Sequence, residues 1–554
     1  MNLKLIENLR QQNAKNESKW IFISLGFMNR RAHVFKVKNN NYIEKNIQDE
    51  ILKLSQSGYE TEWIRVDFIK SLVEVPFMEV IEELPKIRRN YVDFGIAFDS
   101  NFILSFLPEE INANAFVRPI PGKDHQSLFV CEKNINTYLK KFKSYRGIYF
   151  HKKYVNKNIF KFHTQGYLLN NDEVIELIPE GNMHGIRKVE ENERKDEYKK
   201  MIKSATEYLL NQIKDSGRYE YGRFPHFDKK IAFYNMLRHA SSTYSLLEGL
   251  EYLEDESGIE KAKETLDYML ENNLYIDPAE KEAAYIFDDT NKLNEIKLGQ
   301  NGVALVALTK YMSMTNSDEY MGVARKLARG TMRMIGEEGD TVHVLNYPEL
   351  TVKEEKRVIY YDGEAAFGLM RLYQMDENPE WLEYVEILFN HFIEKDYWKY
   401  SDHWLSYCTY ELTKVKPEEK YFIFGLKNVS KRLDFINKRE TTFPTFLEML
   451  MAGYNMVELM KEKGLEDLIK EHLDEEKFNK IIEKRADYQR TGHFYPEIAM
   501  YFKNPESVLG SFFIKHHGYR VRIDDVQHYI SGYIQYENNF NCQKLSENLQ
   551  KCDK

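Results

Sequence analysis

The hydrophobic pattern divides the chain into two parts that meet near residue 190. In the first part, short apolar or alternating runs such as residues 19–26 and 61–69 are separated by brief amphipathic stretches. Alternation with a period of two is typical of β-strands, and the amphipathic stretches have helical spacing. The pattern therefore predicts an α/β or α+β domain over residues 1–185, of which we take α/β as the expectation, and nothing in it indicates what this domain does.

From about residue 195 the pattern is helical almost throughout, and helices of two kinds alternate. One kind, as at 258–275, is amphipathic and charged, which is typical of outer helices with a solvated face. The other kind, as at 301–312, is apolar on most sides and rich in small residues, which indicates buried helices that pack closely. Five pairs are clear, and a sixth can be formed near the C-terminus.

Twelve helices that alternate in this way predict a closed (α/α)6 toroid over residues 195–540, followed by a polar tail over residues 541–554. An open helical solenoid would give the same alternation, but its repeats should be closer to one length. The fold class expected for the whole chain is multidomain α+β, with an N-terminal α/β domain followed by an all-α (α/α)6 toroid.

Polar side chains gather at the predicted N-termini of the inner helices. Because every inner helix of an alternating toroid runs in the same direction, these N-termini should meet at one mouth. Asp and Asn are ordinary N-cap residues, but capping explains neither a histidine nor an arginine, since cations face the unfavourable end of the helix dipole. The residues that we expect at the mouth are Arg238, His239, Asn301, Asp362, Glu364, Asp402, His403, Asp525 and His528.

The carboxyl groups of this set are the first candidates for catalysis. Two carboxylates that flank a glycosidic bond can act as acid and base, or as acid and nucleophile. Asp402 is the expected general acid, because crowded aromatic surroundings raise a carboxyl pKa. Its partner would be Asp362 or Glu364, and Asp525 is a further candidate. The side chains expected to orient water or a hydroxyl group are those of His239 and His403.

Aromatic residues lie beside these acids in the sequence, and sugar rings stack on aromatic faces. Packing of large side chains in a wide toroid explains the same residues. The aromatic residues that we expect to contact substrate are Tyr361, Trp404 and Tyr407.

Basic side chains near the C-terminus predict an anionic group on the substrate. Arg520 and Arg522 alternate along a predicted strand and so share one side, where two guanidinium groups can clamp a carboxylate or a phosphate. An ion pair between Arg522 and a neighbouring aspartate is the simpler interpretation. The other polar residues that we expect to bind substrate are Arg238, Asn301 and His517.

Residues 195–540 resemble the (α/α)6-toroid carbohydrate-active proteins, which include unsaturated glucuronyl hydrolases, polysaccharide lyases and sugar epimerases. The resemblance rests on the alternation of helices and on two motifs at inner-helix starts, YYDGEAAFGLMRLY at 360–373 and DHWLSYCTYEL at 402–412. The chain matches no single family's full catalytic signature, so no catalytic residue is carried over. The resemblance implies a glycosidase-like hydrolase that processes an acidic saccharide or glycoconjugate.

Three alternatives stay open. In the first, His239, His403 and His528 complete a metal site with an aspartate. In the second, a lyase or epimerase uses a histidine or tyrosine to abstract a proton next to a carboxylate that arginines neutralise. In the third, the toroid is a non-catalytic scaffold that binds a peptide or a glycan.

Composition excludes several other classes. Lys and Arg total 78 against 87 Asp and Glu, and a net charge of -9 argues against a general nucleic-acid surface. Four scattered cysteines indicate neither a disulfide framework nor a structural zinc site. Apolar runs stay well short of the ~20 residues that cross a membrane, and a cytoplasmic protein is expected. With no P-loop or GxGxxG motif, no cofactor is predicted, and the sequence does not indicate an oligomeric state.

One polar segment of the N-terminal part, FLPEEINANAF at 106–116, does not fit the toroid mouth. It places Glu109 and Glu110 ahead of Asn112 and Asn114. These residues could line an interface or a second site, but a solvated loop is the simpler prediction.

Overall fold

The computed structural model divides the chain into two compact units, which are described separately. The first unit contains residues 1–191, 223–230 and 490–521, and the second contains 192–222, 231–489 and 522–554. The predicted range of 195–540 for the toroid therefore includes two segments of the first unit. The residues described are 4–12, 19–113, 116–123, 127–143, 147–171 and 173–541, so the predicted tail lies outside them except for Asn541.

The first unit is built on an antiparallel sheet of seven strands among the described residues, in the order β2-β1-β3-β8-β4-β5 with β9 beside β8. Its two long strands pair from Ile64 opposite Leu169 to Pro76 opposite Asn158. The strands of this unit are β1 (Trp20–Gly26), β2 (His33–Lys38), β3 (Trp63–Pro76), β4 (Gly95–Ala97), β5 (Ser105–Phe106), β6 (Val117–Pro119), β7 (Leu128–Val130), β8 (Asn158–Asn170) and β9 (Glu173–Glu176).

Of the two classes that the pattern allowed for this part, the structure has α+β and not the expected α/β. Each pairing within the seven-stranded sheet is antiparallel, so the unit is α+β rather than a parallel α/β domain. Apolar periodicity identifies a strand but carries no information on the direction of its partner, because both kinds of sheet place alternate side chains on opposite faces.

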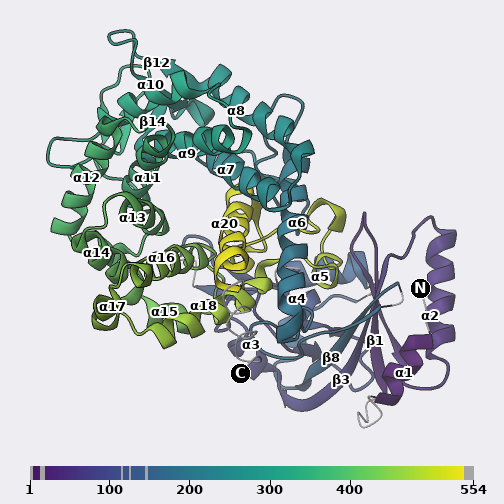
Figure 1. Ribbon diagram of the computed structural model, residues 1–554. Helices are drawn as coiled ribbons and strands as arrows, with labels where there is room; N and C mark the ends of the chain where they lie inside the picture. Colours follow the sequence, from purple (N-terminus) through teal and green to yellow (C-terminus); the bar gives the residue numbers. More distant parts are fainter. Residues whose placement is uncertain are drawn as a thin grey trace. The chain divides into compact units, whose positions relative to one another are not determined.

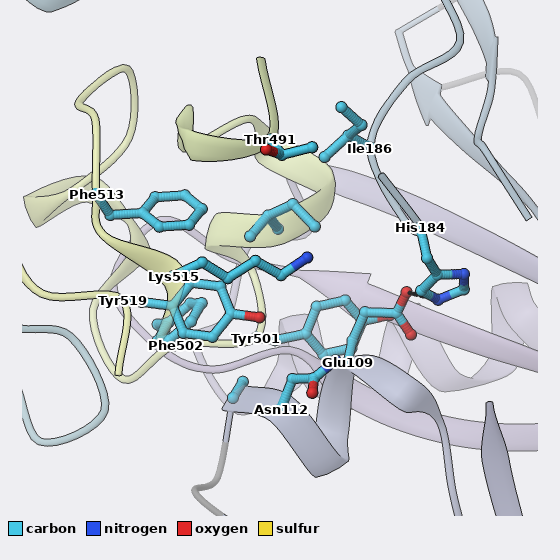
Figure 2. A pocket seen from close by; sticks show the side chains of 12 residues that line it. Glu109, Asn112, His184, Ile186, Thr491, Tyr501, Phe502, Phe513, Lys515 and Tyr519 are labelled. Atoms are coloured by element: carbon cyan, nitrogen blue, oxygen red, sulfur yellow. Dashed lines mark hydrogen bonds and ion pairs between the residues drawn. The ribbon is translucent and has the colours of Figure 1, made fainter. Parts of the chain in front are cut away.

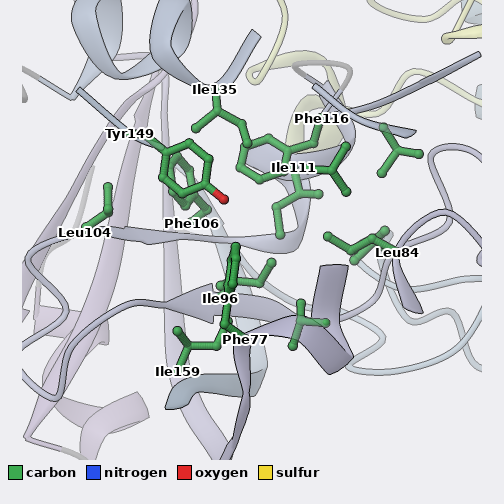
Figure 3. Close-up of a cluster of buried hydrophobic side chains, with 14 of the residues drawn as sticks. Phe77, Leu84, Ile96, Leu104, Phe106, Ile111, Phe116, Ile135, Tyr149 and Ile159 are labelled. Carbon is green, nitrogen blue, oxygen red and sulfur yellow. The ribbon is translucent and has the colours of Figure 1, made fainter. Parts of the chain in front are cut away.

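Two apolar clusters hold the helices of the first unit against its sheet. One contains Phe77, Ile96, Phe106 and Ile111 (Figure 3), and the other joins α1 and α2 to β1, β2 and β3. The helices are α1 (Lys4–Gln12), α2 (Ile43–Gln56), α3 (Phe77–Glu83), α4 (Pro108–Ala113), α5 (Glu132–Phe142) and α19 (Pro496–Ala499). The α4 residues are all buried, so the solvated loop predicted around Glu109 is wrong, and Asn114 lies outside the described residues.

Six buried helices of the second unit form a closed ring. Each contacts the next one along the chain, and α20 contacts α7, which closes the ring (Figure 1). These inner helices are α7 (Met236–Tyr252), α9 (Leu298–Thr315), α11 (Tyr360–Asp376), α13 (His403–Val415), α16 (Thr445–Glu462) and α20 (Ile523–Gln535). A contact between the first and last inner helices is what distinguishes the toroid from a solenoid.

The amphipathic helices pack outside this ring (Figure 1). They are α6 (Arg194–Gln212), α8 (Ile259–Asn273), α10 (Met321–Met332), α12 (Pro379–Glu394), α14 (Glu419–Ser430) and α18 (Glu475–Gln489). Two short helices, α15 (Leu433–Lys438) and α17 (Glu466–His472), supplement them. The described helices include none that is both long and apolar enough to cross a membrane.

The second unit is not all-α as predicted, because long connections between its helices form a five-stranded sheet. Its strands are β12 (Leu274–Ile276), β13 (Ala284–Asp288), β14 (Glu295–Lys297), β15 (Val344–Asn346) and β16 (Val352–Glu354). Three further short strands form a separate sheet: β11 (Lys229–Lys230) belongs to the first unit, whereas β10 (Gly222–Phe224) and β17 (Val521–Arg522) each include residues of both units. Strands of three to five residues are too short for a periodic pattern to reveal.

Candidate functional site

Acidic residues stand at the start of α11 and α13, where the sequence placed them at the predicted mouth. In the structure their side chains are buried. Asp362 accepts hydrogen bonds from Thr341 and from His343, whose Nε2 lies 3.2 Å from Oδ1. Burial acts to raise the pKa of Asp362, but the His343 hydrogen bond and the charge of Lys356 hold it below its ordinary value. Asp362 is therefore held as an anion by partners at Oδ1, although its Oδ2 is buried with no hydrogen-bond partner among the described residues.

Asp402 and Glu364 have the opposite electrostatic character. Asp402 is the N-cap of α13 and accepts a hydrogen bond from the Trp404 backbone N–H at 3.0 Å. Its other carboxyl oxygen lies against Gly363, where the absence of a side chain makes room for it. Burial raises the pKa of both Asp402 and Glu364 well above the ordinary range, and the charges of neighbouring acids add to this.

Two histidines from α13 and α20 meet near the acids. The ring centroids of His403 and His528 are 5.2 Å apart, and the rings are nearly perpendicular at 80°. The side chain of His403 is 5% exposed, whereas that of His528 is 20% exposed. Nε2 of His403 is buried and has no hydrogen-bond partner among the described residues.

Glu448, in the first turn of α16, holds one of these histidines. Its Oε2 lies 2.7 Å from Nδ1 of His528, and Tyr407 donates to its Oε1 at 3.3 Å. Burial acts to lower the pKa of His528, but Glu448 raises it above its ordinary value. For His403, burial and the charge of His528 lower the pKa well below 6.5. The two imidazoles are thus pushed toward opposite protonation states.

Two arginines of the second unit, Arg238 and Arg522, are paired with aspartates at the start of α20. Nε of Arg238 lies 2.8 Å from Oδ2 of Asp524, and Nη1 of Arg238 donates to the Tyr221 hydroxyl at 2.5 Å. Arg522 reaches both Asp524, at 3.0 Å, and Asp525, at 2.9 Å. This is the ion pair that the simpler interpretation of Arg522 anticipated, and it leaves two cations balanced by two anions.

Two predicted mouth residues have their contacts elsewhere. His239 is fully buried, with Nδ1 at 2.7 Å from the Tyr234 hydroxyl and Nε2 at 2.7 Å from the Thr265 carbonyl. Asn301 accepts from the Ile286 backbone N–H and donates to the carbonyl of Lys297. Each of the two side chains therefore connects an inner helix to neighbouring segments through hydrogen bonds.

The predicted aromatic residues are buried by packing and are not exposed at a surface. Tyr361, Trp404 and Tyr407 are 7%, 2% and 5% exposed. Trp404 and Tyr407 stack around Phe367, and both lie near the ring of His403. Packing, the alternative given from the sequence, accounts for most of their surface, although they also border the histidine pair.

His517 and Arg520 belong to the first unit, whereas Arg522 belongs to the second. His517 lies in a short 3-10 turn, Lys515–His517, and Arg520 pairs through its backbone with Ile514. The uninterrupted strand on which Arg520 and Arg522 would share a face is therefore not formed; β17 comprises Val521 and Arg522 alone.

A metal ion could be held by His403, Glu448 and His528, whose ligand atoms lie within 4.8 Å of one another. Two histidines and one carboxylate suit zinc and several other divalent metals. The metal alternative anticipated two of these three residues. His239 is not part of the group, because both of its ring nitrogens are committed to Tyr234 and Thr265.

Glu448 was missed in the sequence, although a signal for it exists. It is a buried acid within an otherwise apolar stretch, TFLEMLMAGYNM at 445–456. A charged residue in such a helix needs a partner, since an isolated buried charge is costly.

A second polar cluster lies inside the first unit, around a cavity of about 20 Å³. Glu109 pairs with Arg65 at 2.5 Å and with His184 at 2.9 Å, and the Lys515 side chain approaches from another segment (Figure 2). Burial lowers the pKa of Lys515 to about 8. The cavity has room for roughly one water molecule, which is too little for a substrate. We therefore interpret this cluster as part of the ion-paired interior of the unit.

Comparison with known proteins relates the chain to others by fold. Neither a protein-family model nor a curated protein matches it. The GH76A α-1,6-mannanase of Salegentibacter sp. HEL1_6 is 12% identical, with a TM-score of 0.42 over 61% of this chain and 98% of that one. The cellobiose 2-epimerase of Bacillus thermoamylovorans B4167 is 14% identical, with a TM-score of 0.47 over 63% and 99%. A D-mannose isomerase is 10% identical, with a TM-score of 0.45 over 63% and 98%.

Proposed function

We propose that the helical unit is a sugar epimerase or isomerase that moves a proton at the carbon next to a carbonyl group, with His403 and His528 as its acid and base. The observation that carries this proposal is the pair of imidazoles 5.2 Å apart, one of them held by Glu448. The opposite pKa directions of the two rings support it, because an acid–base pair needs one neutral and one protonated member.

The neutral imidazole of His403 has a buried nitrogen with no described partner, which suits it to accept a proton. In an open-chain aldose the hydrogen on C2 is acidic because the neighbouring carbonyl stabilises the anion that remains. Removal of this proton leaves an enediolate. The protonated imidazole of His528 then donates a proton, either to the opposite face of C2, which inverts that centre, or to C1, which gives a ketose as the hydroxyl proton on O2 passes to O1. The reaction leaves the two rings with exchanged protonation states. Proton exchange with solvent then restores the original states.

Glu448 is a positioning residue in this scheme. Its carboxylate accepts from Nδ1 of His528, which fixes the tautomer and leaves Nε2 as the atom that faces the substrate. Tyr407 and Gln527 contact the same carboxylate oxygen and keep it in place. Trp404 and Tyr360, whose rings lie 5.0 and 5.7 Å from that of His403, supply apolar surroundings that keep His403 neutral.

The expected substrate changes from an acidic to a neutral sugar. The sequence suggested that arginines bind an anionic group, but Arg238 and Arg522 are already balanced by Asp524 and Asp525. A carboxylate on the substrate would have to compete with these two aspartates. Paired charges instead offer donors and acceptors to sugar hydroxyl groups.

Deuterium exchange tests the proposal directly. The full chain is incubated in D2O with neutral aldoses and ketoses, and NMR follows loss of the C2 proton. We expect exchange with at least one sugar, and a rate reduced by about 10²–10⁴-fold in His403→Gln and in His528→Gln. His391→Gln is the matched control, because that histidine lies in α12 outside the pair, where it contacts the Glu338 carbonyl and the rings of Phe392 and Tyr397. Absence of exchange with every sugar would contradict the proposal and favour a binding scaffold.

A metal-dependent enzyme is the second candidate, favoured by the close grouping of His403, Glu448 and His528. Elemental analysis of the purified protein distinguishes the two. Stoichiometric zinc or another divalent metal that is lost in Glu448→Gln would replace the acid–base pair by a metal site, whereas metal-free protein with full exchange activity would exclude it.

Hydrolysis of a glycosidic bond, the function that the sequence favoured, is supported by one contrast. The pKa of Asp402 is raised by burial, while the His343 hydrogen bond and the charge of Lys356 hold that of Asp362 down despite its burial. Both carboxyl groups are fully buried, however, and Asp402 faces Gly363 of the neighbouring helix. Release of new reducing ends from oligosaccharides, abolished by Asp402→Asn but retained in His528→Gln, would restore the glycosidase assignment.

A further inference from the structure

A second concave site lies in the first unit, away from any residue used above. Its volume is about 450 Å³, within the range of small-molecule pockets. It is formed by the β1–β2 connection at 29–31, by one face of α5, and by His226, Phe227 and Lys503. None of these residues belongs to the helical ring.

The lining of this pocket carries positive charge only. It contains Arg30, Arg31, Lys141 and Lys503, and within the described residues no Asp or Glu lines it. Burial lowers the pKa of His226 to about 3, so that ring stays neutral and the charge comes from the other four. On a chain with net charge -9, four cations without an acid are a local exception.

One of these cations is buried at the base of the pocket. Arg31 is 6% exposed, and its guanidinium lies 4.8 Å from the ring of Phe142 and 5.8 Å from that of Tyr138. Burial lowers the pKa of Arg31 to about 10, although the charge of Glu110 acts in the opposite direction. An anion bound in the pocket would further offset the cost of burying this guanidinium.

The remaining cations are available at the rim. Lys141 is exposed, and Lys503 is exposed with its ammonium group 3.3 Å from the Phe227 carbonyl. Arg30 stacks on Tyr59 at 3.9 Å. Among the described residues, none of these three forms an ion pair with a carboxylate. Lysines and arginines in this setting bind phosphate oxygens through charge-assisted hydrogen bonds.

Aromatic rings give the pocket an apolar side. Phe142 and Tyr138 line it from α5, and Phe227, which is 66% exposed, lines it from the opposite segment. A purely ionic ligand would leave these aromatic rings exposed to water. An organic group attached to the anion would cover them.

We propose that this pocket binds a small organic phosphate, with the phosphate among Arg30, Arg31, Lys141 and Lys503 and the organic part on Phe142 and Phe227. The site goes beyond the proposed function, because it shares no residue with the histidine pair and needs no sugar chemistry there. Nucleic acid is the less favoured ligand, since the positive charge is confined to one cavity of a net acidic chain.

Calorimetric titration of the full chain tests the site, with phenyl phosphate as the probe. We expect saturable binding at one site per chain, weaker binding of inorganic phosphate and none of phenol. Lys141→Glu and Lys503→Glu should each weaken phenyl phosphate by about tenfold or more, because each replaces a favourable charge by a repulsive one. Both lysines are exposed, so neither variant removes a core contact.

Lys199→Glu is the matched control, since it makes the same charge change on an exposed position of α6 in the other unit. Binding that falls equally in this variant would reflect net charge and overturn the site. Equal affinity for inorganic sulfate and phenyl phosphate, or no binding of either, would also overturn it. So would tighter binding of a short single-stranded oligonucleotide that the same two variants abolish.

Discussion

At the scale of single residues, the helical unit controls the charge of its histidines through burial and one carboxylate. His403 and His239 are buried without an acid in hydrogen-bond contact from a neighbouring helix, whereas His528 contacts Glu448. The pKa of the same side-chain type is therefore shifted in opposite directions within one ring of helices. Two predictions concern this control.

Glu448→Gln should lower the pKa of His528, since Glu448 is what raises it against burial. A histidine with a raised folded pKa contributes stability that is fully present below its unfolded value of about 6.5 and is lost as pH rises through the folded value. The difference in unfolding free energy between wild type and variant should thus be larger at pH 6 than at pH 9. NMR titration of the ring and denaturant unfolding at both pH values measure this, and an unchanged pKa would contradict the coupling.

His239→Gln should change stability with the opposite pH dependence. Burial lowers the pKa of His239 to about 4, so its contribution is present above about pH 6.5 and declines as pH falls toward 4. Glutamine does not titrate, and the advantage of wild type over the variant should shrink by about 2–3 kcal/mol between pH 7 and pH 4.5. Urea unfolding at constant ionic strength tests it; an unchanged difference would mean that this ring titrates normally.

At the scale of elements, closure of the ring depends on how closely neighbouring inner helices approach. Between α9 and α11, Gly302 lies against the backbone of Glu364, and Gly368 lies against Gly302. Small residues at these positions were noted in the sequence as a sign of close packing. The structure shows which of them touch backbone.

Gly302→Ala should destabilise the protein, because its methyl group would overlap the Glu364 carbonyl and neither helix backbone can yield locally. We expect a loss of about 1–3 kcal/mol or more in unfolding free energy. Gly322→Ala, in α10, is the control: a methyl group there meets nothing within 4 Å, so this variant should be neutral or slightly more stable. Equal effects of the two variants in thermal unfolding would show that helix propensity, not contact, matters at Gly302.

At the scale of the whole molecule, the chain leaves the first unit after residue 191 and returns to it twice, at 223–230 and at 490–521. Residues 490–521 supply Glu497, which pairs with Arg187 at 2.9 Å, and Tyr501, whose hydroxyl lies 2.9 Å from Ser24. The backbone of Ala32 also donates to the carbonyl of Met500. The first unit is thus completed by a segment that the sequence pattern assigned to the toroid.

Glu497→Ala should therefore destabilise the first unit, since it removes the buried carboxylate that pairs with Arg187. The expected loss is about 2–4 kcal/mol, whereas Glu180→Ala, which breaks the exposed pair with Lys70, should cost less than about 1 kcal/mol. Hydrogen exchange along β1 and β3 reads the effect within the first unit. Similar small losses for both variants would mean that the returning segment is not needed for its stability.

The amino-acid pattern by itself determined where the chain changes from strands to helices and that the helices alternate between solvated and buried kinds. Those properties depend on local spacing and on the apolar surface of each segment. It also drew attention to His403 and His528 near helix N-termini. A histidine there is unusual in any fold, because its positive charge would face the unfavourable end of the helix dipole.

Only the tertiary structure decided which polar residues meet. His239 and Asn301 have the same sequence signature as His403, yet their neighbours turn them into internal fastenings. Glu448 is brought to His528 by the packing of α16 beside α20, across 80 residues of sequence. The pairing of Arg522 with Asp524 and Asp525 likewise removes a charge that sequence alone leaves available. Burial and partner identity set these roles, and both depend on contacts distant along the chain.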